Sequence, residues 1–352
     1  MSDDERSARP WMHWLLPVFT LALLALFARS IDWGHAWSAT MHANPALLAG
    51  ATIANLASLG FKGVRWWLFL EPAGVPGMGQ AVRAAFAGAA LNNVLVANGG
   101  DAARVAAMAR RGNVSSAAVL ATLAVDRFCD LVSYAALFAG AAFALPLPPE
   151  LARWRMPGFA ALGGLAAIGV ALVWRGTANG TRADDALVED TSALERVRRY
   201  WRRLIETSAS IVTGPRFAAA IGLSFLAWAG QWATFHYAAH ATAFPVTAGQ
   251  SLLALLVVNA SFLVRLTPGN VGVFQLLYAL AATSAGLEKT SAVAVGFLVQ
   301  LIQYVPVTVI GLLLAPSLVK GRTSPALAPE VARAVPQSDQ TMRVRGDIGR
   351  NT

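Results

Sequence analysis

Long apolar runs constrain this chain more than any other feature of its sequence. About 20 apolar residues are enough for a helix to cross a hydrocarbon core of about 30 Å. Several runs approach or exceed that length and contain few charges. They are Met12–Ala28, Pro45–Leu70, Ser115–Leu145, Gly158–Trp174, Phe217–Phe244 and Ser291–Leu314. The sequence therefore predicts a membrane protein that crosses the bilayer several times as helices.

The composition argues against a water-soluble fold. Of the 352 residues, 56% are apolar and only 13% are charged, whereas a soluble globular domain carries about 25% charged residues. The first run follows Arg6 and Arg9 as a signal sequence would, but the many later runs favour an uncleaved first span. The formal net charge is +9, and the arginines cluster in loops between the apolar runs. This distribution indicates membrane topology and not nucleic-acid binding.

Two further apolar regions, Ala81–Arg111 and Thr247–Ser284, are interrupted by glycine and polar residues at positions 98–101 and 267–270. A break at membrane depth must be buried in protein or line a cavity, because lipid cannot hydrogen-bond the freed backbone. We therefore expect two helical hairpins, either re-entrant or crossing the bilayer twice. The predicted fold class is an all-α polytopic membrane protein with about six full spans plus two broken or re-entrant helical hairpins.

The distribution of lysine and arginine predicts the topology. With the amino terminus inside and both hairpins returning to their side of entry, most of the 28 Lys and Arg residues fall on the cytoplasmic side. The densest block, Arg196–Arg203, is then inside, as the positive-inside rule requires. We expect both termini in the cytoplasm and the protein in the bacterial inner membrane.

The same topology divides the chain into three parts. Residues 1–11 form a cytoplasmic tail, residues 12–318 a transmembrane domain, and residues 319–352 a disordered cytoplasmic tail. Within the domain, a basic cytoplasmic loop at 175–216 separates Pro45–Leu145 from Phe217–Leu314. Each of these halves has the order span, hairpin, span in opposite orientation, which predicts an inverted repeat of the transporter kind. The loop helix either lies on the anionic inner leaflet or is an ordinary solvated helix.

Charges inside an apolar run are the first candidates for a functional site. Asp126, Arg127 and Asp130 share one run, where exposing a charge to lipid costs at least about 2.5–3.5 kcal/mol. Arg127 can reach Asp130 three residues further along the helix. The group predicts either a salt bridge that fixes helix packing or a functional pair beside a substrate pathway.

The hairpin breaks supply candidates for binding a lipid headgroup. Glycines let backbone N–H groups approach a ligand, and a helix that begins after a break directs its positive end toward an anion. Guanidinium groups match phosphate geometry. The alternatives are a structural turn capped by Asp101 and an Arg265 that reaches the membrane interface. The hairpin candidates are Asn92, Asn93, Gly100, Asp101, Arg104, Arg265, Pro268, Gly269, Asn270 and Gln275.

Sequence signatures of enzymes and of metal sites are weak. His236 and His240 have the i, i+4 spacing of metal ligands, but Tyr237 stands where a zinc protease carries glutamate and no third ligand is evident. We find no Walker loop and no nucleophile elbow. We therefore expect packed histidines, no cofactor, no metal and no enzymatic activity.

Short motifs occur in an order that resembles the lysylphosphatidylglycerol synthase transmembrane family, the flippase-like membrane proteins. They are the stretch from Asn92 to Arg104, then Asp126, Arg127 and Asp130, then the stretch from Pro268 to Phe274. The resemblance covers roughly Met12–Leu318 and implies a stand-alone membrane part, without the soluble synthase domain of two-domain members.

The chain also departs from this family's pattern. Members often have glutamate at the positions of Asp126 and Gln275 and arginine near Gln300. Here Gln275 and Gln300 are neutral amides, so the resemblance implies that a neutral pair replaces a charged one. That replacement puts charge coupling through this helix pair in doubt.

Residues and resemblance together predict a flippase or transporter for an amphipathic lipid of the phospholipid or isoprenoid type. The expected partners are membrane lipid, the anionic inner leaflet and lipid-biosynthesis enzymes, but not nucleic acid. One alternative is a non-transporting accessory subunit of an envelope pathway. Another is an enzyme acting on a lipid-linked sugar, which is disfavoured because neither paired exposed carboxylates nor a nucleotide site can be assigned.

Overall fold

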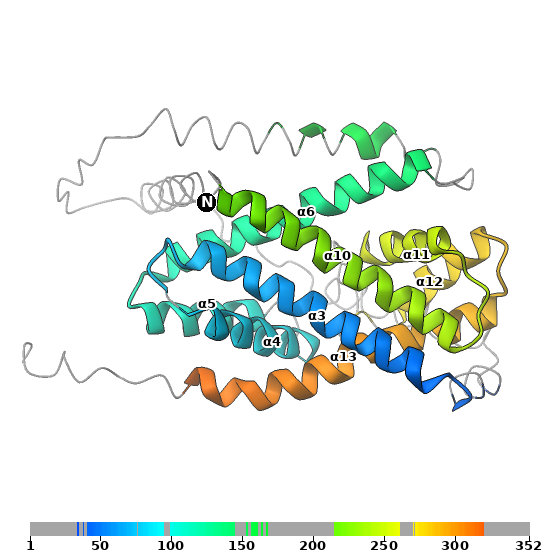
Figure 1. Cartoon of the computed structure of the whole chain (residues 1–352), viewed down its shortest axis with the longest axis horizontal. Coiled ribbons are helices and arrows are strands. Elements are labelled where there is room, and N and C mark those ends of the chain that lie inside the picture. Colours follow the sequence, from blue (N-terminus) through cyan, green and yellow to red (C-terminus); the bar gives the residue numbers. More distant parts are fainter. Residues whose placement is uncertain are drawn as a thin grey trace, which may run out of the picture. The chain divides into compact units, whose positions relative to one another are not determined.

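The computed structural model describes residues 34, 38, 41–75, 77–94, 99–144, 153, 156–160, 163, 164, 167, 215–260, 270 and 272–319. The regular secondary structure of these residues is entirely helical (Figure 1). Three of the described helices are long and apolar enough to cross a membrane, over Pro45–Leu70, Ser116–Ala144 and Lys289–Pro316. These findings confirm an all-helical, multi-pass membrane protein. The predicted run Met12–Ala28 and most of Gly158–Trp174 lie outside the described residues.

The first half of the described chain consists of α3 (Pro45–Leu70), α4 (Met78–Val94), α5 (Gly99–Gly112) and α6 (Ser116–Ala144). The α3 helix begins where the Asn44 side chain accepts a hydrogen bond from the Ala46 backbone N–H at 2.9 Å. Pro45 follows at the first helical position, which needs no N–H donor. The α4 and α5 helices pack against each other, so the predicted first hairpin is present.

The second half consists of α10 (Pro215–Ala241), α11 (Ala248–Ala260), α12 (Val273–Ser284) and α13 (Lys289–Val319). The predicted run Phe217–Phe244 is one continuous helix up to Ala241, and α11 packs on α12 as the predicted second hairpin. Glu288 precedes α13 and accepts hydrogen bonds from the backbone N–H groups of Ser291 and Thr290, at 2.6 and 2.7 Å. These bonds lower the pKa of Glu288 to about 2 and cap the helix.

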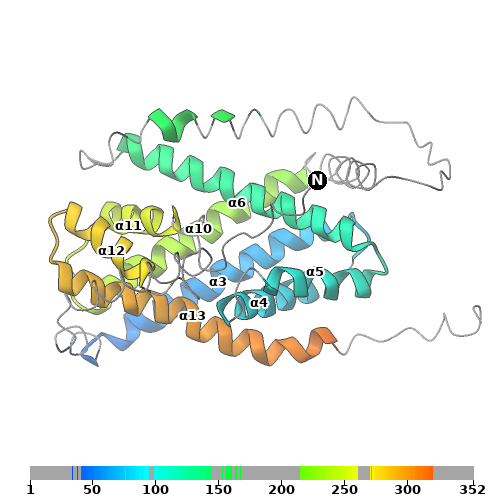
Figure 2. The same cartoon turned by 180° about the vertical axis from the view of Figure 1, so that it is seen from behind.

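The helices of the two halves make matched contacts (Figures 1 and 2). Exchanging α3 with α10, α4 with α11, α5 with α12 and α6 with α13 converts each main helix–helix contact into another one. For example, α4–α13 becomes α11–α6, and α3–α13 becomes α10–α6. In addition, Met78 of α4 follows Pro45 by the same number of residues as Ala248 of α11 follows Pro215. The main helix–helix contacts within and between the described parts of the two halves therefore correspond in pairs.

The first helices of the two halves run antiparallel. Thr234 donates a hydrogen bond to the Ala51 carbonyl, and further along α3 Ser58 donates to the carbonyl of Ala227, which is earlier in α10. Gly230 permits this approach, because a β-carbon there would lie 2.8 Å from the Ala54 carbonyl oxygen. Small residues allow close backbone contact between membrane helices. Opposite direction of equivalent helices is what an inverted repeat requires.

Candidate functional site

A cavity of about 410 Å³ lies between helices of both halves. Its volume falls within the range of about 300–1,000 Å³ that small-molecule sites occupy. The described residues that line it come from α3, α4 and α6 of the first half, from α10, α11 and α13 of the second, and from Asn270. Many of these residues are polar, although the helices that carry them are apolar overall.

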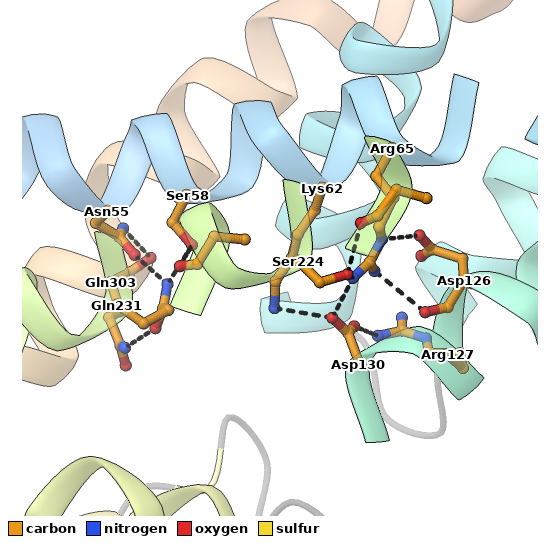
Figure 3. Close-up of polar contacts among 12 residues, drawn as sticks. Asn55, Ser58, Lys62, Arg65, Asp126, Arg127, Asp130, Ser224, Gln231 and Gln303 are labelled. Carbon is orange, nitrogen blue, oxygen red and sulfur yellow. Dashed lines mark hydrogen bonds and ion pairs between the residues drawn. The ribbon is translucent and has the colours of Figure 1, made fainter. Parts of the chain in front are cut away.

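Arg65 anchors a buried ionic cluster beside this cavity (Figure 3). Its side chain is 0% exposed. Its Nε atom donates to Asp126 Oδ1 at 2.7 Å, and its Nη1 atom donates to Asp130 Oδ1 at 2.8 Å. Further donors reach Ser224 Oγ at 2.9 Å and the Asp126 carbonyl at 3.1 Å. Arg65 therefore joins α3, α6 and α10, and it is the main counter-ion of both aspartates.

Lys62 lies one turn before Arg65 on α3 and lines the cavity. Its Nζ atom is 3.9 Å from Asp130 Oδ1 and 5.6 Å from the centre of the Trp228 ring. The side chain is 29% exposed, in contrast to Arg65. Because Asp130 is already engaged by Arg65 at shorter range, Lys62 presents a weakly neutralised positive charge to the cavity.

Arg127 pairs mainly with Asp101 across α5 and α6. Its Nη2 atom is 2.8 Å from Asp101 Oδ2, whereas its Nη1 atom is 3.9 Å from Asp130 Oδ2. The pair predicted between Arg127 and Asp130 is thus present only as a long contact. Arg127 lines the cavity and is 51% exposed.

Arg104 lies buried within the first hairpin and not at a headgroup site, where its position in the sequence suggested that it would lie. Its Nη2 atom is 3.1 Å from Asp101 Oδ1, and its guanidinium carbon is 4.6 Å from the centre of the Trp66 ring. The residue is 7% exposed and is not among the residues that line the cavity. This geometry gives no support to headgroup binding by Arg104 and favours a structural role in the first hairpin.

A chain of uncharged polar side chains continues along α3 on the other side of Lys62 (Figure 3). Gln231 Nε2 donates to Asn55 Oδ1 at 3.1 Å and to Ser58 Oγ at 3.2 Å, and Gln303 Nε2 donates to Gln231 Oε1 at 2.8 Å. Asn55 also donates to the carbonyl of Ile302 at 3.2 Å. We call Asn55, Ser58, Gln231 and Gln303 the amide chain. It ties α3, α10 and α13 together at the cavity wall.

The structure brings only some of the predicted site residues to the cavity. Asn92 and Asn93 line it and also fix α4, because Asn92 accepts from the Gly100 N–H at 2.9 Å and Asn93 donates to Thr308 Oγ1 at 3.0 Å. Predicted residues that also line it are Arg127, Asp130 and Asn270, whereas Gly100, Asp101, Arg104, Asp126, Gln275 and Gln300 do not. Arg265, Pro268 and Gly269 lie outside the described residues.

The two amides of the second hairpin and α13 do form a neutral pair. Gln275 Nε2 donates a hydrogen bond to Gln300 Oε1, and Gln275 Oε1 accepts one from the Gly272 N–H at 2.6 Å. Both residues are buried. The pair therefore holds the start of α12 against α13 and contributes no charge.

The histidines that resembled metal ligands instead make packing contacts. His236 Nδ1 lies 3.0 Å from Ser251 Oγ, and His240 Nε2 lies 3.1 Å from the Val246 carbonyl oxygen. Within the part of the chain that the structure describes, no group of three His, Cys, Asp or Glu side chains could hold a metal ion.

Comparison with known proteins gives two matches. The chain is 25% identical to Glycosyltransferase AglD of Haloferax volcanii over 316 residues, which cover 81% of this chain and 50% of that protein. It therefore spans about half the length of that relative. Residues 14–311 match the family described as Lysylphosphatidylglycerol synthase TM region. Because this match covers most of the chain and agrees with the helical fold, the protein belongs to the lysylphosphatidylglycerol synthase transmembrane family.

Proposed function

We propose that this protein moves an amphipathic lipid of the phospholipid or isoprenoid type across the bacterial inner membrane, with the headgroup in the cavity and the acyl or isoprenoid chains in the bilayer. The observation that carries the proposal is the polar cavity of about 410 Å³, with Lys62 and Arg127 in its wall, between two groups of helices in an apolar helical protein.

The physical reason is the cost of moving a headgroup through hydrocarbon. An unpaired polar group loses several kcal/mol when it leaves water for an apolar medium. The side chains of the cavity wall can replace water as hydrogen-bond partners, as in transporters whose sites lie between inverted repeats.

The proposed topology places both termini and the basic loop at 175–216 in the cytoplasm, with about six spans and two hairpins at membrane depth. The lysine and arginine distribution supports this orientation. The antiparallel α3 and α10 support the inverted relation of the halves.

A second candidate function is glycosyl transfer to or from a lipid-linked sugar, which the name of the Haloferax volcanii relative favours. Asp130 is the one carboxylate among the described residues that line the cavity, and Arg65 and Lys62 already engage it. That arrangement suits a structural counter-ion better than a free general base. A non-transporting accessory subunit of a lipid-biosynthesis enzyme remains the third alternative.

The test is reconstitution of the purified full chain into vesicles that contain a fluorescent phospholipid analogue. An impermeant quencher acts only on labelled lipid in the outer leaflet. Transport predicts that labelled lipid of the inner leaflet becomes accessible to the quencher faster than in protein-free vesicles. Vesicles that contain a lipid-linked sugar and an acceptor are checked in parallel for product by mass spectrometry. Product formation without lipid movement would establish the enzyme. If neither lipid movement nor product is detected, the transport proposal is refuted and the accessory role is left.

A further inference from the structure

Charge is distributed unequally between the two walls of the cavity. The ionised side chains of the cluster, Lys62, Arg65, Asp126, Arg127 and Asp130, all come from α3 and α6 of the first half. The described lining residues of the second half are uncharged, and they include the amides Gln231, Asn259, Asn270 and Gln303. Along α3, the lining thus offers a ligand charge at Lys62 and neutral hydrogen-bonding groups toward Asn55, where Gln231 and Gln303 also lie (Figure 3).

The charged side of the cavity carries an excess of positive charge. The described cluster and its neighbours contain four cations, Lys62, Arg65, Arg104 and Arg127, and three carboxylates, Asp101, Asp126 and Asp130. Each carboxylate is within 3.1 Å of an arginine nitrogen. Arg104 and Arg127 share the one carboxylate Asp101, and the carboxylate nearest Lys62 among the described residues is Asp130, at 3.9 Å. The excess charge is therefore presented to the cavity at Arg127 and Lys62, which both line it.

Two stretches that adjoin lining residues in the sequence contain no carboxylate. Residues 95–98 follow the lining residues of α4, and residues 261–269 lie between the lining residues Asn259 and Asn270. Neither stretch contains Asp or Glu. These stretches therefore add no carboxylate to the count.

We infer that the headgroup carried by this site is an anionic phosphodiester that bears hydroxyl groups and no ammonium group. This inference rests on the proposed function and names the class of lipid. The phosphate lies near Lys62, where a charge-assisted hydrogen bond supplements the attraction of unlike charges. The hydroxyl groups lie toward the amide chain, because each amide offers two donors and two acceptor lone pairs, more than its contacts in the structure use.

The same geometry disfavours a cationic or zwitterionic headgroup. An ammonium group in the cavity would need a carboxylate, and the carboxylate available in the described lining is Asp130. Taking Asp130 away from Arg65 would leave a fully buried arginine without one of its two partners, and breaking a buried pair is strongly destabilising. The site therefore selects against aminoacylated lipids as well as against phosphatidylethanolamine.

Two kinds of lipid share the inferred chemistry. One is a phospholipid such as phosphatidylglycerol, and the other is a polyprenyl phosphate joined to a sugar. Both place a single phosphodiester charge beside a hydroxyl-bearing group, so the cavity alone accommodates either. The source of the headgroup is an outcome of the test.

The experiment measures which lipids the purified full chain retains. The protein is equilibrated with vesicles that contain equal amounts of phosphatidylglycerol, phosphatidylmethanol, phosphatidylethanolamine and lysylphosphatidylglycerol, then exchanged into detergent and analysed by mass spectrometry. Phosphatidylmethanol has the charge of phosphatidylglycerol but lacks the hydroxyl groups, and so it tests the amide chain alone. A second arm replaces phosphatidylglycerol by a polyprenyl phosphate sugar.

We expect phosphatidylglycerol or the polyprenyl phosphate sugar to be enriched over both the ammonium lipids and phosphatidylmethanol. Lys62→Met should reduce this enrichment about tenfold or more, and Lys62→Arg should retain it. Lys289→Met is the matched control, because it removes the same charge at the start of α13, where Lys289 does not line the cavity.

Two outcomes would overturn the inference alone, and a third would refute the proposed function as well. Equal retention of the ammonium lipids would show that charge does not select the headgroup. Equal retention of phosphatidylmethanol by the wild-type protein would show that the amide chain does not recognise hydroxyl groups. Both comparisons use the wild-type protein, so they hold even if a variant folds poorly. Retention of no lipid of any class would refute the proposed function and the inference together.

Discussion

Replacing Arg65 by methionine should be among the most damaging single changes in the described part of the chain. The substitution keeps much of the side-chain length but removes a guanidinium that is 0% exposed and makes ion pairs of 2.7 and 2.8 Å. Asp126 and Asp130 would lose their nearest cation. Breaking a buried pair in this way costs about 3–5 kcal/mol, which is a large part of the stability of a typical domain.

The size of this effect is best measured against two comparison variants. Arg65→Met combined with Asp126→Asn removes one buried cation and one buried carboxylate, leaves Asp130 with Lys62, and should recover part of the loss. Arg216→Met removes an arginine whose partner, Glu71, lies 2.9 Å away in an exposed pair, and such pairs are worth about 0–1 kcal/mol. Fluorescence-detected size exclusion after heating would rank the variants in detergent. If Arg65→Met were as stable as Arg216→Met, the buried cluster would not hold the helices together.

Three further results are expected. Gly230→Leu should lower folded yield, because a β-carbon there already meets the Ala54 carbonyl oxygen at 2.8 Å. Gly222→Leu should be tolerated, because a β-carbon at Gly222 meets nothing within 4 Å. Equal yields of the two variants would contradict the close packing of α3 on α10. Arg104→Gln should lower thermal stability, because it weakens the contact with Asp101. The variant protein that remains folded should retain lipid as the wild-type protein does. Loss of lipid retention at unchanged stability would instead support headgroup binding by Arg104. Reporter fusions near Thr181 and at the carboxyl terminus should both report the cytoplasm, and an outside signal at Thr181 would overturn the hairpin assignment.

Much of the fold follows from properties that are local in the sequence. Run length and charge content located α3, α6, α10 and α13, and the glycine and asparagine interruptions located the gap between α4 and α5 and the gap between α11 and α12. The order of these elements indicated the repeat. Its inversion gains structural support from the contacts of Ser58 and Thr234, which show that α3 and α10 are antiparallel.

The site was harder to predict, because its pairs form between helices. Asp126 and Asp130 stood out as charges in an apolar run, but their main partner, Arg65, is 61 residues before Asp126. The same signal was present in α3, since Lys62 and Arg65 are charges inside the predicted run Pro45–Leu70. Applying the argument about buried charges to that run would have identified both residues.

The amides and Arg104 show two other limits of local reasoning. Gln231 and Gln303 are neutral, so they stand out less than a charge in apolar helices, and only packing brings them together with Asn55. Arg104 lies close to a break and was a reasonable phosphate ligand. Its contact with the ring of Trp66, on a different helix, decides its orientation, and no spacing in the sequence encodes that contact.

A variant that fills the cavity without changing its charge tests most directly whether lipid moves through the cavity. Ala89 lines the cavity on α4, and tryptophan at this position would occupy space that the headgroup needs. The measurement is the rate of quenching of inner-leaflet lipid in vesicles that contain the wild-type protein or Ala89→Trp, after equal thermal stability is established. We predict that the wild-type protein accelerates lipid movement over protein-free vesicles and that Ala89→Trp loses most of this acceleration. Equal rates for a stable Ala89→Trp variant and the wild-type protein would contradict transport through this cavity.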